Sequence, residues 1–263
     1  MAEPGTAPSA YAQSMATAAQ PTDTAATITL PASFHLVRYP RGGPAREAFS
    51  RMGFDRPVLQ RTPGLRAFRL LGTGAGDQMA FSADLRRWAL LAFWSSEADL
   101  DAFLTDSEIP RRWDALAEER YDLRLATVRA HGSWGRTRFN VDRAAPLRPE
   151  QPVVILTRAA IRARHLARFW TAAPRPSADA VGHPDNLASI GIGDVPVLRQ
   201  ATLSLWRSLA GAQDFAYRRA AHREVVDRTR AEDWYSSELF ARFVPLASSG
   251  TWSGRDPLEG LLP

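Results

Sequence analysis

Apolar and polar residues alternate in several short stretches of the chain, and two of these stretches look like copies of each other. Trp88 to Trp94 is an apolar run that ends in Trp, and Thr202 to Trp206 ends in the same way. A Phe follows each of these tryptophans at the same spacing, at Phe103 and Phe215, inside a helical pattern. A repeated pattern of this kind predicts two structural units of similar build.

Glycines mark both copies. A Gly-rich segment that we expect to form a turn comes before each one, at Gly72–Gly76 and at Gly191–Asp194. Each copy then closes on a related sequence, Gly132-Ser-Trp134 in the first and Gly250-Thr-Trp252 in the second. The repeat therefore extends over most of each half.

The hydrophobic pattern predicts the same order of elements in both halves. In the first half it predicts strands at 34–39, 66–71, 88–94 and 123–129, and helices at 45–52, 97–104 and 111–119. In the second half it predicts strands at 153–158, 187–192, 198–206 and 243–247, and helices at 163–170, 212–230 and 235–241. Each half reads β-α-β-β-α-β, a ferredoxin-like unit whose sheet has helices on one face only. We therefore predict an α+β fold of two tandem ferredoxin-like repeats, packed sheet to sheet as an α+β barrel within one chain.

Composition places the boundaries. Residues 1–30 are rich in Ala, Thr, Pro and Ser, and we expect a disordered N-terminal tail there and no secretory signal. The Pro-rich stretch 145–152 separates an N-terminal half, 31–144, from a C-terminal half, 152–263. We expect the C-terminal half to carry the functional site.

Two residue types are missing, and their absence excludes whole classes of chemistry. The chain has no Cys, which excludes thiolate-ligated haem, iron–sulfur clusters and Cys-based zinc sites. It has no Lys, because its 33 basic residues are all Arg, which excludes a Schiff-base lysine and a Walker-type phosphate loop. The net charge of +5 is spread among acids without a basic block, so we do not expect nucleic-acid binding. No apolar run is long enough for an integral membrane span.

Five histidines remain as metal-binding candidates: His35, His131, His165, His183 and His222. His222 differs from the others because it lies in the helical stretch 215–230 and aligns with Pro110 in the first half. A zinc site would need further ligands at helical spacing, whereas a haem needs a single imidazole from the protein. The residues leave two interpretations open, an axial haem ligand at His222 or an ordinary structural histidine.

An ordered set of motifs resembles the spheroidene monooxygenase family. In the second half these motifs are Thr157–Ala159, Ile190–Pro196, Gln200–Trp206, the helix with His222, Trp234–Phe243 and Gly250–Leu258. In the first half Gly72–Gly76 and Ser133–Gly135 match as well. The resemblance spans about Phe34 to the C-terminus, and the stretch from Arg175 to Asn186 shows no clear match.

The resemblance implies a haem b-dependent monooxygenase of the dimeric α+β barrel superfamily, with His222 as the axial ligand of the iron. Arg158 and Gln200 are candidates for a polar catalytic role beside the haem, and Arg158 is also a candidate partner of the haem propionates. The implied partners are an apolar carotenoid-like or specialised-metabolite substrate and an electron donor of unknown identity, and a homodimer stays possible. We expect a cytoplasmic protein, with loose membrane association left open.

Three other functions stay open at this point. The haem could serve another reaction, such as aldoxime dehydration or a reaction of nitrogen compounds. The protein could bind haem without oxygenase activity. It could also be a ferredoxin-like dimer that binds a small apolar molecule and no metal.

Overall fold

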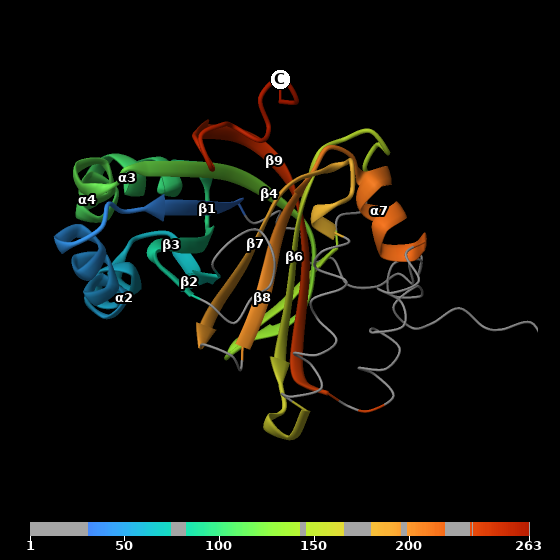
Figure 1. The fold of residues 1–263 in the computed structure, drawn as a ribbon, viewed down its shortest axis with the longest axis horizontal. Coiled ribbons are helices and arrows are strands. Elements are labelled where there is room, and N and C mark those ends of the chain that lie inside the picture. Colours follow the sequence, from blue (N-terminus) through green and yellow to red (C-terminus); the bar gives the residue numbers. More distant parts are fainter. Residues whose placement is uncertain are drawn as a thin grey trace, which may run out of the picture.

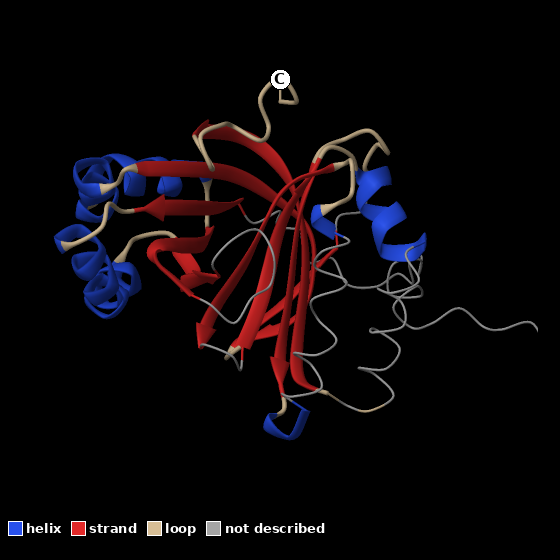
Figure 2. Ribbon diagram, viewed as in Figure 1, coloured by secondary structure: helices blue, strands red, loops and turns tan. Residues whose placement is uncertain are grey.

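The computed structural model describes residues 31–74, 83–142, 146–165, 180–195, 199–218, 232 and 234–262. Within these residues the chain has a mixed α+β fold, with one nine-stranded antiparallel sheet and four α-helices (Figure 2). The strands are β1 (Pro31–Arg38), β2 (Leu65–Gly74), β3 (Ala83–Trp94), β4 (Glu119–Trp134), β5 (Thr137–Asp142), β6 (Val153–Ile161), β7 (Asn186–Val195), β8 (Arg199–Trp206) and β9 (Tyr235–Gly250). The helices are α2 (Gly43–Arg61), α3 (Glu97–Asp106), α4 (Glu108–Leu116) and α7 (Leu209–Arg218), with a 3-10 turn at Ala163–His165.

Eight of the strands close on themselves as a ring. Their order is β1-β3-β2-β7-β8-β6-β9-β4, and β4 pairs back with β1, while β5 extends from β4. The first half supplies β4-β1-β3-β2 and the second half supplies β9-β6-β8-β7, so both halves place their fourth, first, third and second strands in that order. The two halves join along β2–β7 and along the much longer β4–β9 contact.

The inside of the ring is the main hydrophobic core. Apolar side chains from all eight ring strands form one buried cluster, which includes Phe34, Leu71, Leu91, Leu156 and Phe243. Since successive side chains of a strand point to opposite faces, this core uses every second residue of each strand and leaves the others on the outer face. These outer-face side chains need a covering layer, and the described helices provide it differently in the two halves.

The described helices cover the two halves unequally. Helices α2, α3 and α4 lie together against the first half, and α7 lies on the other side of the molecule (Figure 1). Under the first group a second buried cluster includes Val37, Leu90, Trp94, Phe103 and Trp113. Among the described residues, no helix is both long and apolar enough to cross a membrane.

Two glycines at the β4–β9 contact let the long strands approach closely. Gly132 has φ of 107°, and a Cβ added there would lie 2.1 Å from the carbonyl oxygen of Glu238. Gly250, at the equivalent place in the second half, has φ of 79°, and its Cβ would lie 2.1 Å from the carbonyl oxygen of Arg120. The repeated Gly-x-Trp sequences therefore mark the points where each long strand meets the other half.

Three local predictions were wrong, and one strand was missed. Gly72–Gly74, expected in a turn, lie within β2. The segment 235–241 is not a helix, because it is the first part of β9, where Leu239, Ala241 and Phe243 alternate into the core. Gly191–Asp194 is not a turn but lies within β7, whose pairing with β8 shifts register between Ile192 and Val195. The predictions also missed β5, which pairs with the end of β4 and is short and largely polar. The predicted tail 1–30 lies outside the described residues.

Candidate cofactor face of the second half

The outer face of the second half, defined here as the side of β6, β7 and β8 turned away from the ring interior, includes a row of small residues. Strand pairing places Gly191, Thr202 and Thr157 side by side across β7, β8 and β6. In the first half the equivalent row across β2, β3 and β1 is Leu70, Leu90 and His35. The same register therefore carries bulky side chains in one half and short ones in the other.

The neighbouring row has one bulky and two short side chains in both halves. Ser189, Ser204 and Ile155 lie side by side in the second half, where the first half has Phe68, Ala92 and Ser33. Small residues on a sheet leave room above it, because side chains fill the space to the next layer only where they are large. This face therefore suits a flat ligand.

Helix α7 stands at one end of this face. It begins after Trp206, and Phe215 packs on the Trp206 indole with ring centroids 5.4 Å apart. Val153, Leu209 and Ala212 complete a small buried cluster around the two aromatic rings. His222 follows shortly after the end of α7 in the sequence, outside the described residues, so its predicted role as the axial haem ligand stays a prediction.

The four described histidines all have hydrogen-bonding partners for their rings. In the first half, His35 Nδ1 lies 2.8 Å from Asp122 and its Nε2 lies 2.9 Å from the Ser33 hydroxyl. His131 Nε2 accepts a hydrogen bond from Arg129 Nε at 2.9 Å.

The two described histidines of the second half are held in the same way. His165 Nε2 accepts from Arg164 Nε at 2.9 Å, and its ring stacks on Trp234. His183 Nδ1 accepts the backbone N–H of Asp185 at 3.1 Å, which leaves its Nε2 to donate to Asp214 at 3.4 Å. Among the described residues, no group of three or more His, Cys, Asp or Glu side chains is placed to hold a metal ion.

Arg158 lies on the inner side of the ring. It is 5% exposed and shares its side of β6 with Val154 and Leu156. Its guanidinium donates to the Ser133 carbonyl at 3.2 Å and to the Ser237 hydroxyl at 2.8 Å. It also lies 5.6 Å from the centre of the Trp134 ring, which Arg69 approaches to 5.5 Å. The guanidinium thus ties β6 to the ends of β4 and β9.

Gln200 occupies the opposite register. Its backbone pairs with Ala159, whereas Arg158 pairs with Ala201, so positions 158 and 200 belong to opposite faces of the sheet. The structure does not bring the two predicted residues together on one face. The side chain of Gln200 lies outside the described part of the structure.

Sequence reasoning missed a buried polar network in the first half. The Ser33 hydroxyl lies 2.9 Å from His35 Nε2 and accepts a hydrogen bond from Trp94 Nε1 at 2.9 Å. Asp122 contacts His35 on one side and Arg120 on the other, at 2.8 and 2.7 Å. Burial by itself would raise the pKa of Asp122, but His35 and Arg120 outweigh burial and hold that pKa below its ordinary value.

This network has the order of a Ser-His-Asp triad without access to a substrate. Ser33 and His35 are at most 1% exposed, and Phe103 and Trp113 pack on the imidazole. A nucleophile must reach a substrate carbonyl, which this hydroxyl cannot do. The only signal for the network was a His in an otherwise apolar strand, because Asp122 is distant in sequence.

Comparisons with known proteins give the family. No protein-family model matches the chain. The chain is 34% identical over 229 residues to a spheroidene monooxygenase of Rhodobacter capsulatus, with 86% of this chain and 95% of the relative covered. It is 35% identical over 209 residues to the spheroidene monooxygenase of Rubrivivax gelatinosus, with 77% and 79% covered.

Solved structures share the fold at much lower identity. Two aldoxime dehydratase structures superpose with TM-scores of 0.58 and 0.59, at 12% and 9% identity. They cover 82% and 90% of this chain and 81% and 86% of their own. That likeness shows the fold alone, whereas the sequence identities show descent. The chain belongs to the spheroidene monooxygenase family.

Proposed function

We propose that the protein is a haem-dependent monooxygenase that oxidises an apolar, carotenoid-like substrate. The observation that carries this proposal is the identity of 34% to a spheroidene monooxygenase across 95% of that relative's length. A relation over the full length extends to the elements around the active site as well as to the scaffold. The aldoxime dehydratase likeness does not favour the alternative reaction, because it rests on fold at low identity.

The residues present fit a haem in the second half. The outer face offers small side chains at Gly191, Thr202 and Ser204, where a flat macrocycle can lie against the sheet. We propose His222 as the axial ligand, as the resemblance to this family implies, because it follows α7 in the sequence of the second half. A bound haem b would supply the activation of molecular oxygen, and the protein would hold it, orient the substrate and exclude water.

Gln200 and Arg158 take different parts in this proposal. Position 200 lies in the register of the small-residue face, next to Ala159 and Thr202, and we propose it for the polar role beside the ligand. A catalytic or propionate-binding role for Arg158 requires the ligand to reach the inner side of the ring. Its guanidinium would have to meet the substrate or a haem propionate from the inner side of the ring, where it now contacts Ser133 and Ser237.

The two halves, 31–144 and 152–263, are proposed to be tandem ferredoxin-like repeats. The shared strand order, the matching tryptophans Trp94 and Trp206, and the glycines Gly132 and Gly250 support this proposal. The identity of the electron donor and a homodimer stay predictions.

The test is the absorption spectrum of protein expressed with ample haem, for the native chain, His222→Ala and the control His131→Ala. We expect a Soret band near stoichiometric occupancy in the native chain and in the control, and its shift or loss in His222→Ala. Reductant-dependent oxygenation of a carotenoid then separates an oxygenase from a protein that only binds haem. A folded but colourless native chain would refute the proposal.

A further inference from the structure

Helix α2 presents an unusual outer face, defined here by its exposed residues Arg46, Phe49, Ser50, Gly53, Phe54, Arg56, Pro57, Gln60 and Arg61. Phe49 is 62% exposed and Phe54 is 69% exposed. Leu85 is 60% exposed. These three are among the four exposed large apolar side chains of the described residues. Isolated apolar residues on a surface need no explanation, but a group of them does.

The α2 outer face carries positive charge and no carboxylate. Arg46, Arg56 and Arg61 are exposed, and none of them forms an ion pair with a described residue. Of the two acids of the helix, Glu47 has a side chain 39% exposed that pairs with Arg51, and the buried Asp55 pairs with Arg112. The face therefore combines two exposed phenylalanine rings with three exposed arginines.

Phe49 of this face is held in place. Phe49 packs edge-on against Trp88, with ring centroids 5.8 Å apart. Trp88 Nε1 donates to the carbonyl of Leu85 at 3.0 Å, so Phe49, Trp88 and Leu85 form one connected group from α2 to β3.

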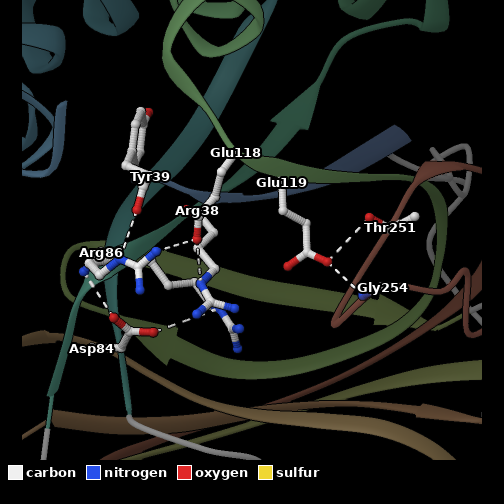
Figure 3. A network of polar contacts seen from close by, with 9 residues as sticks. Arg38, Tyr39, Asp84, Arg86, Glu118, Glu119, Thr251 and Gly254 are labelled. Carbon is white, nitrogen blue, oxygen red and sulfur yellow. Dashed lines mark hydrogen bonds and ion pairs between the residues drawn. The ribbon is translucent and has the colours of Figure 1, made fainter. Parts of the chain in front are cut away.

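A polar network fixes the strand that carries Leu85 (Figure 3). Arg86 donates to the Tyr39 carbonyl at 2.9 Å and to Glu118, and its backbone N–H donates to Asp84 at 2.9 Å. Arg38 contacts the same Glu118 at 2.9 Å. The exposed Leu85 therefore belongs to a segment bound to the ends of β1 and α4, and its exposure is built into the fold.

From this arrangement we propose that the α2 outer face docks on the surface of an anionic lipid bilayer. Exposed aromatic rings insert at the boundary between headgroups and acyl chains, and arginines on the same face contact the lipid phosphates. The helix lies at the outer margin of the molecule, so it meets a flat surface more readily than it accepts a segment of another protein (Figure 1).

The experiment is co-sedimentation of the full chain with vesicles of phosphatidylcholine, with and without phosphatidylglycerol. We expect binding to the vesicles that contain phosphatidylglycerol, weakened on the order of tenfold by Phe49→Ala with Phe54→Ala. Leu246→Ala, at the exposed leucine of β9, is the matched apolar control and should bind as the native chain does.

The charge contribution is tested with a second pair of variants. Arg46→Gln with Arg56→Gln should weaken binding roughly fivefold for each arginine removed. Arg148→Gln with Arg207→Gln removes the same charge from exposed positions outside α2 and should change binding little. Equal losses in both double variants would overturn the proposal, since they would reflect net charge alone.

Two further outcomes would also overturn it. One is a native chain that binds neither vesicle. The other is a fall in molar mass by light scattering in Phe49→Ala with Phe54→Ala, which would make the face a contact between two copies of the chain. Vesicle binding needs neither haem nor turnover, so its failure is distinct from failure of the oxygenase proposal.

Discussion

Replacing Asp122 by Asn should destabilise the protein through the buried network of the first half. The carboxylate accepts from His35 at 2.8 Å and from Arg120 at 2.7 Å, and His35 is 1% exposed. An amide keeps the shape and one acceptor oxygen but removes the charge from both contacts. A hydrogen bond to a charged group contributes about 1.5–3 kcal/mol and a neutral one about 0.5–1.5 kcal/mol, so the two changes together should cost about 2 kcal/mol.

The loss should depend on pH in a defined direction. The folded state holds the pKa of Asp122 below its ordinary value of 3.8. The contribution of the carboxylate to stability is therefore complete above about pH 3.8 and is lost as the pH falls through the depressed folded pKa. The difference between the native chain and Asp122→Asn should be largest at neutral pH and should shrink in stronger acid.

Urea unfolding at neutral and at acid pH measures both effects, with Asp114→Asn as the control. Asp114 binds the same Arg120 but is 64% exposed, and exposed ion pairs contribute about 0–1 kcal/mol. If Asp122→Asn destabilises no more than Asp114→Asn, or if its loss is the same at both pH values, the network does not act as described.

The remaining predictions concern the β4–β9 contact, the hidden hydroxyl and the buried arginine. Gly132→Ala should lower the free energy of unfolding by at least about 2 kcal/mol, since its Cβ would meet the Glu238 carbonyl. Gly254→Ala is the control, because Gly254 also has a positive φ, of 83°, but open space around it, and it should cost about 1 kcal/mol. Equal urea midpoints for the two variants would contradict this. Ser33→Ala should keep full oxygenase activity, and a fluorophosphonate probe should leave the native chain unlabelled by mass spectrometry. If Arg158 meets the ligand, Arg158→Ala should leave haem content intact while turnover falls, and parallel loss of both would assign Arg158 to structure.

Alternation and repetition in the sequence were enough to find most strands and their order along the chain. The tryptophans Trp94 and Trp206 end equivalent strands, as their spacing indicated. The segment 235–241 misled because Glu238, Leu239 and Ala241 are good helix formers. Pairing with β6 on one side and β4 on the other overrides that preference, and such contacts are not visible in local sequence.

The candidate site was only partly accessible to sequence reasoning. The face that Arg158 occupies was predictable from the sequence, because Arg158 follows the core residues Val154 and Leu156 at a spacing of two residues along the strand. The contact of His35 with Asp122 could not, since it depends on the β1–β4 register across a long separation in sequence. His222 was singled out by its contrast with Pro110, and it stays a prediction.

The difference between the two outer faces is itself an argument for a ligand in the second half. Leu70, Leu90 and Val37 in the first half correspond by register to Gly191, Thr202 and Ala159. Each lost methylene costs about 0.8 kcal/mol of apolar burial, and more where a void remains. Three such replacements on one patch would be an accumulating loss unless something else filled the volume. A flat cofactor against the sheet replaces those contacts with its own. The same small residues that lower the apolar burial on this outer face therefore make room for a ligand there.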